Sequence, residues 1–348
     1  MTFKELATKL FFHFASLLVA FPLQASGQKT LYSNDDEIVK PRIRVIIDND
    51  FGGDPDGLFQ LAHQLLSSST DVRAIICSHH YKEFYGYSGK VDEARKQVKE
   101  LLKIMHKEGI PVYLGSDSSF VSPQRPLYSE GAQAIIHEAM RDDPRPLYVV
   151  CGAALTNMAS AYLLRPAISK RIKAVVWIGG VEYANLCNSM RQNKREYNQS
   201  IDPVSSQVVF NYSDLNIWQI PRNVYRQALY SHAELKRKLA TSGPTGHYLM
   251  DRLDDLLRRA KGKLGECYVL GDSPLVLVTS LQTPWEQDAA SCEYAISRTP
   301  FINASGFYED NPQGRPIRIF TRVDTRLIID DLEAKLSGRY YAMLLISA

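Results

Sequence analysis

The chain has 348 residues, of which 45% are hydrophobic and 23% are charged, and its formal net charge at pH 7 is +3. This composition is typical of a globular protein with a sizeable core, and it excludes an intrinsically disordered or collagen-like chain. The nearly balanced charge gives no electrostatic reason to expect nucleic acid or an anionic membrane surface as a partner. The five cysteines lack CxxC or CxxH spacing, so neither a disulfide framework nor a zinc site is predicted.

The N-terminal segment has the pattern of a secretory signal peptide. A basic head with Lys4 and Lys9 precedes an apolar stretch of about a dozen residues and a short run of small residues. A membrane-spanning helix would need about 20 apolar residues. We therefore expect a secreted or periplasmic protein without a membrane segment in its mature form. The predicted organisation is a signal peptide at 1–27, a polar linker at 28–41 and a single domain at 42–348.

After the linker, short apolar runs alternate with segments of helical period. The runs predicted as strands are 44–48, 72–77, 110–115, 146–152, 172–180 and 215–221. The segments predicted as helices are 57–66, 91–109, 129–142, 156–166 and 202–212. Leu58, Leu61 and Leu65 show the apolar spacing of three, four and seven that indicates a helix. Strands that are apolar on both faces and alternate with helices predict an α/β fold, with a mostly parallel central sheet covered by helices on both faces.

The first predicted strand runs into a loop with four aspartates, in the stretch IIDNDFGGDPDG at 46–57. In open α/β sheets the binding crevice lies beyond the carboxyl ends of the strands, which is where this loop stands. Four carboxylates in one turn repel one another and call for a cation. Oxygen ligands and flexible glycines favour Ca²⁺ or Mg²⁺, whereas zinc would recruit His or Cys. A simpler alternative is that Asp54 only caps the helix that follows Pro55, but capping leaves Asp48 and Asp50 unexplained.

This stretch and four later segments resemble one enzyme family. IIDNDFGGDPDGLFQLA resembles the signature of the inosine-uridine-preferring nucleoside hydrolases, whose first strand ends in an acidic loop that holds calcium. CGAALTNMASAYLL, VVWIGG, EYNQSIDPVSSQVVF and LGDSPLVL resemble further segments of that family in the same order. The resemblance covers most of residues 42–335, and the order of five matches is more specific than any single one.

The resemblance implies a calcium-dependent hydrolase of the N-glycosidic bond of ribonucleosides or a related riboside, with magnesium as a possible substitute. Asp50 matches both a metal ligand and the base that activates water. The implied metal ligands are Asp50, Asp54, Asp56, Thr156 (through its carbonyl) and Asp272. The residues expected to bind the sugar are Asp54, Glu196 and Asn198, and Asp48 matches a carboxylate behind the ligands. The family also suggests a homo-oligomer.

Several positions depart from the family pattern. Pro55 separates two aspartates that are consecutive in the family, and Gly271 stands where the family has a histidine that helps the leaving group depart. The family's Gly-Asn segment after the second strand is replaced here, and His79 and His80 take its place as candidate ligand contacts. These changes suggest a variant, secreted subgroup with an altered substrate.

Two other functions are compatible with parts of the sequence. One is a secreted sugar- or nucleoside-binding protein that keeps the calcium pocket but has lost turnover through Gly271 and Pro55. The other is a phosphatase of the haloacid-dehalogenase type, with Asp48 as nucleophile and magnesium as cofactor. That family expects Thr or Val at the position of Gly52, and the Asp330-Asp331 pair lies too near the C-terminus for its role.

Overall fold

The computed structural model describes residues 39–80, 85–187, 195–282 and 291–347. The predicted signal peptide and most of the predicted linker lie outside these ranges. Within them, the centre is an eight-stranded sheet with the order β3-β2-β1-β4-β5-β6-β12-β9. The strands of this sheet are β1 (Ile43–Asn49), β2 (Thr70–Cys77), β3 (Val112–Leu114), β4 (Leu147–Cys151), β5 (Ile172–Ile178), β6 (Ile217–Ile220), β9 (Cys292–Arg298) and β12 (Pro316–Val323).

The sheet is parallel except at one edge. β12 runs parallel to β6, and β9 pairs with β12 in the antiparallel direction. The predicted mostly parallel sheet is therefore confirmed, and β9 adds an antiparallel strand that the sequence patterns did not predict. β1 lies between β2 and β4, so the chain leaves β1 towards one edge and later returns to its other side at β4. Such a reversal opens a crevice beyond the carboxyl ends of the two strands.

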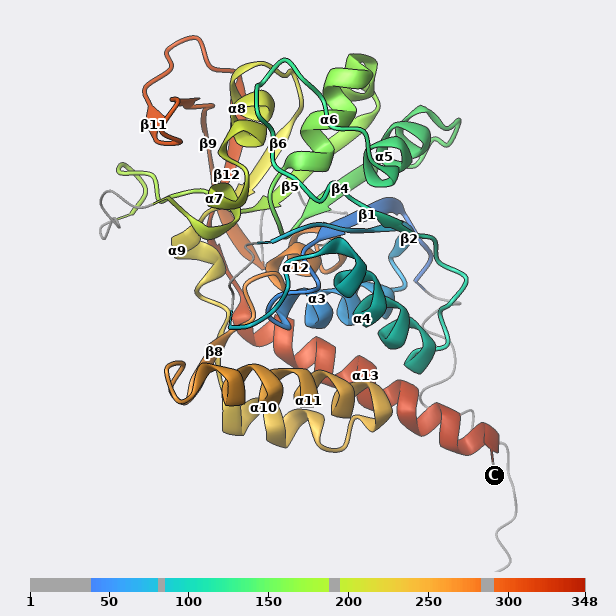
Figure 1. Cartoon of the computed structure of the whole chain (residues 1–348). Helices are drawn as coiled ribbons and strands as arrows, with labels where there is room; N and C mark the ends of the chain where they lie inside the picture. The colour runs from blue at the N-terminus through green and yellow to red at the C-terminus, as the bar shows by residue number, and fades with distance from the viewer. Residues whose placement is uncertain (1–38, 81–84, 188–194, 283–290, 348) are drawn as a thin grey trace, which may run out of the picture. The chain divides into compact units, whose positions relative to one another are not determined.

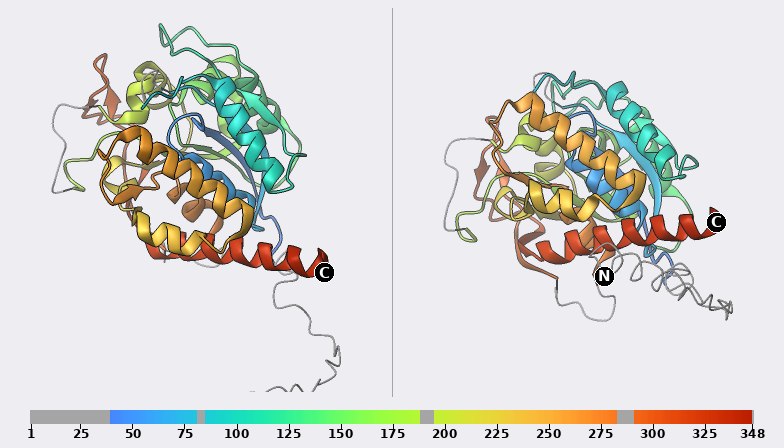
Figure 2. Two further views of the ribbon diagram at one scale, coloured as in Figure 1. Left: turned by 60° about the horizontal axis from the view of Figure 1, so that its bottom comes forward. Right: turned by 90° about the horizontal axis from the view of Figure 1, so that it is seen from below.

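Helices cover both faces of the sheet, as Figures 1 and 2 show. One face carries α5 (Glu130–Met140), α6 (Thr156–Leu164), η1 (Pro166–Lys170) and α8 (Pro203–Asn211). The other face carries α3 (Asp56–Leu65), α4 (Val91–Ile104), α10 (His232–Leu239), α11 (Gly243–Ala260), α12 (Pro274–Ser280) and α13 (Thr325–Ser347). The shorter elements are α7 (Tyr197–Ile201), α9 (Arg222–Tyr225), β7 (Leu229–Ser231), β8 (Cys267–Val269), β10 (Phe301–Ile302) and β11 (Tyr308–Glu309).

Each face of the sheet has its own apolar core, because the alternate side chains of a buried strand point to opposite faces. Ile47 of β1 packs with the helices that include α3 and α11, whereas Ile46 packs with those that include α5 and α6. Cys77 and Cys151 are fully buried free cysteines. Within the described ranges, no helix combines the length and the apolar composition needed to cross a bilayer.

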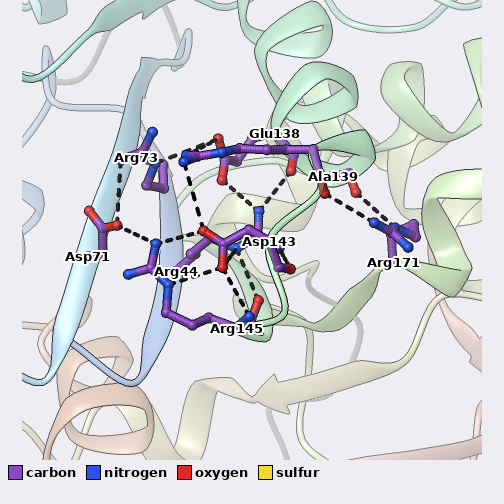
Figure 3. A network of polar contacts seen from close by, with 9 residues as sticks. Arg44, Asp71, Arg73, Glu138, Ala139, Asp143, Arg145 and Arg171 are labelled. Atoms are coloured by element: carbon purple, nitrogen blue, oxygen red, sulfur yellow. Dashed lines mark hydrogen bonds and ion pairs between the residues drawn. The ribbon is translucent and has the colours of Figure 1, made fainter. Parts of the chain in front are cut away.

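The amino ends of the strands are tied together by a charged network (Figure 3). Arg44 of β1 is only 2% exposed, and its Nη1 donates to Glu138 Oε1 of α5 at 2.6 Å. Its Nε donates to the carbonyl of Arg145, and Arg145 pairs with Asp71 of β2 at 3.0 Å. Asp143 receives two hydrogen bonds from Arg145, which hold the pKa of that carboxyl well below its usual range. The network fixes the end of the molecule opposite the crevice.

Candidate active site

A cavity of about 490 Å³ lies at the carboxyl ends of β1, β4 and β5. Its wall contains four aspartates, Asp50, Asp54, Asp56 and Asp272, together with Glu196 and Asn198. Asn49 connects the two distant parts of this set, since its Nδ2 donates to Asp272 Oδ2 at 2.9 Å while the next residue in the chain is Asp50. Carboxylates from the early loop and from the turn before α12 thus share one cavity.

The acidic loop is held by its own short-range hydrogen bonds. The amide of Gly53 donates to the Asp50 carbonyl at 2.9 Å, and the amide of Asp50 donates to Asn49 Oδ1 at 2.8 Å. Helix α3 follows Pro55 and has no side-chain N-cap. Asp54 instead accepts a short hydrogen bond from the phenol of Tyr268 on β8. Helix capping is therefore not the role of Asp54.

Gly152, directly after β4, must lack a side chain for the loop to take this form. A Cβ at this position would lie 2.4 Å from Asn49 Nδ2, much closer than two such atoms can approach. The amide of Gly152 donates to the carbonyl of Asp48, and its own carbonyl accepts from Asn198 Nδ2 at 3.0 Å. The glycine thereby brings the ends of β1 and β4 and the Asn198 side chain into direct contact.

Neighbouring carboxylates disfavour the charged forms of Asp50, Asp56 and Asp272. Burial, followed by the charges of Asp272 and Asp54, raises the pKa of Asp50 well above its ordinary value. Burial and the same two neighbours raise the pKa of Asp56 in the same way. Burial also raises the pKa of Asp272, although the hydrogen bond from Asn49 opposes that rise. A bound cation would remove this repulsion.

The donor set fits a hard divalent cation, because it consists of carboxylate oxygens and nearby carbonyls. The repulsion among Asp50, Asp56 and Asp272 is the structural feature that such a cation would relieve. As they stand, no three His, Cys, Asp or Glu side chains of the described part have the arrangement of a completed metal site.

Asp48 lies behind this wall, fully buried at the end of β1. Ser78 Oγ donates to its Oδ1 at 2.5 Å and Asn157 Nδ2 donates to the same oxygen at 3.2 Å. Burial raises the pKa of Asp48 to about 7, although both hydrogen bonds act in the opposite direction. This position agrees with the placement of Asp48 behind the ligands in the sequence analysis.

Glu196 and Asn198 are held rigidly at the start of α7. Glu196 is 1% exposed, caps α7 by accepting from the Gln199 amide, and accepts from the phenol of Tyr225 at 2.8 Å. Asn198 Nδ2 donates to the carbonyls of Gly152 and Ile178. Burial raises the pKa of Glu196, and its hydrogen bonds oppose that rise. Both side chains line the cavity, where the sequence analysis expected sugar contacts.

Three predicted site residues take other positions. Thr156 begins α6, and its hydroxyl donates to Asp202 Oδ2 at 2.7 Å; among the described residues that line the cavity, this segment contributes Gly152 instead. His79 has one ring nitrogen 2.8 Å from the Ser116 carbonyl and the other 3.2 Å from Ser119 Oγ, which directs it away from the cavity. His80 packs beside Gly53, and its charge acts on Asp54 from outside the cavity wall.

Sequence reasoning missed two tyrosines of the site. Tyr268 holds Asp54, and Tyr225 holds Glu196. The ring of Tyr225 also fills the space beside Gly271, because a Cβ there would lie 3.2 Å from Tyr225 Cδ2. Tyr225 follows β6 at the carboxyl edge of the sheet, and this was the only sequence signal that pointed to it.

Comparison with known protein families identifies the family of this chain. The family model described as inosine-uridine preferring nucleoside hydrolase matches residues 45–297, which is most of the described domain. The chain belongs to this family. The nucleoside hydrolase of Leishmania major is 31% identical over 122 residues, covering 35% of this chain and 37% of that protein. That of Crithidia fasciculata is 30% identical over 123 residues, covering 34% and 36%. The matched segments therefore span little more than a third of these relatives.

Solved nucleoside hydrolases share the fold over a greater length. A plant nucleoside hydrolase superposes with a TM-score of 0.68 at 18% identity, covering 85% of this chain and 99% of the other. A purine-preferring ribonucleoside hydrolase from Gardnerella vaginalis gives 0.63 at 18% identity, with 85% and 98% covered. An effector protein gives 0.59 at 13% identity, with 87% and 94% covered. At these identities the likeness to the solved structures concerns the fold alone. Membership of the nucleoside hydrolase family, shown by the family model, leaves no basis for the haloacid-dehalogenase-type phosphatase alternative.

Proposed function

We propose that this nucleoside hydrolase family member is a calcium-dependent N-glycosyl hydrolase of ribonucleosides or a related riboside. The observation that carries the proposal is the meeting of Asp50 and Asp272 in one cavity, linked through Asn49 at 2.9 Å. The fold alone would not support it, because one fold hosts many functions. The arrangement of the side chains has the chemistry that the reaction needs.

The cavity carboxylates would hold the metal. Asp50, Asp54, Asp56 and Asp272 supply carboxylate oxygens, and the carbonyl of Thr156 is the further ligand that the family resemblance implies. Bound calcium would supply positive charge that orients a ribose diol and a water molecule and makes that water more acidic. Magnesium, which has a stricter octahedral geometry, is the competing occupant to test.

Asp50 acts as the base in this proposal. Cleavage of an N-glycosidic bond passes through a sugar ring with oxocarbenium character. Water attacks this ring as the nucleobase departs. Asp50 takes a proton from the attacking water, because it faces the cavity from the acidic loop. Asp48 lies behind it in a hydrogen-bonded, buried position and keeps the end of β1 in place.

Glu196 and Asn198 position the ribose, together with Asp54. Their side chains are fixed by the protein, Glu196 through Tyr225 and Asn198 through two carbonyls, so little conformational entropy is lost when a sugar binds. The Tyr225 ring closes the wall beside Gly271, where other family members carry a histidine. Gly271 has no side chain that could donate a proton to the departing nucleobase.

The experiment is the release of free base from inosine and uridine, followed with calcium and with a chelator, for the wild type, Asp50→Ala and the exposed control Asp142→Ala. We expect activity in calcium, and a loss of about a hundredfold or more in Asp50→Ala, the lower end of what a general base contributes. Asp142→Ala should behave as wild type. Turnover that survives in both the chelator and Asp50→Ala would contradict the proposal. Calcium-dependent binding of ribose without any turnover would favour the binding-protein alternative.

We also propose that the protein is exported and that residues 1–27 are removed, with the family's tendency to form homo-oligomers retained. Residues 1–27 lie outside the described ranges, so the sequence pattern carries this proposal. N-terminal sequencing of the mature protein from the secreted or periplasmic fraction tests it. A mature chain that still begins at Met1 would contradict export by this route.

A further inference from the structure

Two basic side chains line the same cavity as the carboxylates. Arg226 directly follows α9, next to Tyr225, whose phenol donates to Glu196. Lys263 lies in the turn after α11. Both are exposed to solvent, whereas Asp50 and Asp272 are buried in the cavity wall. The cavity is therefore acidic where it is buried and basic where it meets the solvent.

Two nearby arginines pair with carboxylates, and these two basic groups of the cavity do not pair with any carboxylate of the described residues. Arg222, on the same helix as Tyr225, pairs with Glu182 at 2.8 Å, and Arg259, at the end of α11, pairs with Asp255 at 2.8 Å. In the part of the chain that the structure describes, no carboxylate pairs with Arg226 or Lys263. A neutral nucleoside has no group of opposite charge for them, whereas a phosphate ester does.

The position of such a phosphate follows from the chemistry of ribose. When the 2′ and 3′ hydroxyls face the carboxylate wall, the 5′-oxygen is the remaining sugar position that can carry a phosphate. Resting on the function proposed above, we propose that the substrates are ribonucleoside 5′-monophosphates, with the phosphate bound by Arg226 and Lys263. Water adds to C1′ and gives a proton to Asp50, while the C1′–N bond breaks and its electron pair leaves with the base. The base nitrogen then takes a proton from solvent, and the sugar product is ribose 5-phosphate.

The test compares kcat/KM for inosine and inosine 5′-monophosphate in the wild type, in the double variant Arg226→Gln/Lys263→Gln, and in Arg237→Gln. Arg237 is an exposed arginine on α10 outside the cavity and serves as the matched control. We expect the wild type to prefer the monophosphate. The double variant should lower the ratio of monophosphate to nucleoside kcat/KM by about tenfold or more, since two charge-assisted contacts are lost. Arg237→Gln should leave the ratio unchanged.

The outcomes separate this inference from the function on which it rests. Hydrolysis of inosine at least as good as that of its monophosphate, or a ratio that the double variant does not move, overturns the phosphate site and leaves the hydrolase intact. If neither substrate is cleaved, the hydrolase proposal fails, and calorimetric titration of the wild type with ribose and ribose 5-phosphate in calcium decides the phosphate site. Tighter binding of ribose 5-phosphate, lost in the double variant, supports it, and equal affinities reject it.

Discussion

Gly152 shows how a single missing side chain positions several groups of the site. The space that a Cβ would need is occupied by Asn49, which in turn holds Asp272. Gly152→Ala should displace Asn49, lower the free energy of unfolding by about 1 to 3 kcal/mol and reduce base release strongly. Denaturant unfolding and steady-state kinetics measure the two effects. Gly109→Ala is the control, because a Cβ at Gly109 meets nothing within 4 Å. Equal behaviour of the two variants would show that the close approach at Gly152 is unimportant.

Gly271 and Tyr225 form a second pair in which one residue takes the space left by the other. A side chain at 271 would meet both Tyr225 Cδ2 and Asp56 Oδ2 at 3.2 Å from its Cβ. Gly271→His should therefore lower kcat/KM instead of restoring the family's leaving-group residue. Gly271→His/Tyr225→Ala should recover part of that loss, because the ring no longer blocks the imidazole. Measuring kcat/KM for Gly271→His, Tyr225→Ala and the double variant gives the coupling energy between the two positions. Additive losses would mean that the two positions do not compete for space.

At this scale, sequence reasoning named carboxylates that the structure brings to one cavity, but not how the side chains around them point. The aspartates were found because a buried strand runs directly into a glycine-containing acidic turn, a pattern set by local chain order. His79 points away from the cavity and the hydroxyl of Thr156 bonds elsewhere, because their partners Ser116 and Asp202 come from segments distant in sequence. Tyr225 and Tyr268 carry no local pattern that distinguishes them from core aromatics. Side-chain direction depends on tertiary neighbours, which a single sequence does not specify.

Among the elements, α3 and α13 are joined by a contact that responds to acid. His63 of α3 is fully buried and its Nε2 lies 2.6 Å from Asp331 Oδ2 of α13. Burial lowers the pKa of His63 below its ordinary 6.5, although Asp331 opposes that shift. On acidification the unfolded chain therefore takes up a proton on this histidine at a higher pH than the native protein does. The contribution of His63 to the free energy of unfolding is complete above about pH 6.5. It is lost as the pH falls from there to the lowered pKa of the native state.

We expect the difference in the free energy of unfolding between wild type and His63→Gln to shrink on acidification from pH 7.5 to 5.5. The slope for one proton is at most about 1.4 kcal/mol per pH unit. Asp331 does not titrate in this range: burial alone would raise its pKa, but hydrogen bonds from His63 and Lys335 lower it below its ordinary value. Urea titrations of both proteins at several pH values make the measurement. A difference that stays constant or grows in acid would refute the assignment.

At the opposite end of the sheet, Arg44 ties β1 to α5. Arg44→Met would leave Glu138, which is 6% exposed, without its closest ionic partner. Breaking a buried ion pair from one side costs about 3 kcal/mol, so the denaturant midpoint should fall clearly. Lys170→Met removes the solvent-exposed pair with Asp214 and should change the midpoint little. If Arg44→Met unfolds at the same denaturant concentration as Lys170→Met, the network of Figure 3 does not stabilise the fold.

The parallel strands β1 to β6 and the helices that follow them were predictable from the sequence, because each is a short segment with a clear apolar pattern. The predicted strand at 44–48 corresponds to Ile43–Asn49, and the predicted helix at 57–66 corresponds to Asp56–Leu65. The helices α10, α11 and α13 and the strands β9 and β12 were not predicted. Gly243, Pro244 and Gly246 weaken the helical pattern of α11 at its start. The pairing direction of β9 depends on where β12 enters the sheet, and no local pattern encodes that position.

For the whole molecule, calcium should stabilise the folded state and do so through the cavity carboxylates. A ligand at about a hundred times its dissociation constant adds about 2.7 kcal/mol of stability, so the melting temperature should rise on addition of calcium and return with a chelator. Asp56→Asn should abolish the rise. In the chelator the same variant should melt at or above the wild-type temperature, because it relieves the repulsion from Asp272 and Asp54. A calcium shift that Asp56→Asn retains would place the ion elsewhere.

The hydrogen bond between Asn49 and Asp272 joins residues that are 223 positions apart in the chain. Synthesis proceeds from the amino end, so the acidic turn leaves the ribosome long before its partner does. Until that late segment arrives, the early aspartates have neither their fourth carboxylate nor the turn that completes the pocket. A truncated or still-growing polypeptide therefore lacks the complete acidic cavity, which forms only once the chain through Asp272 has been made and folded.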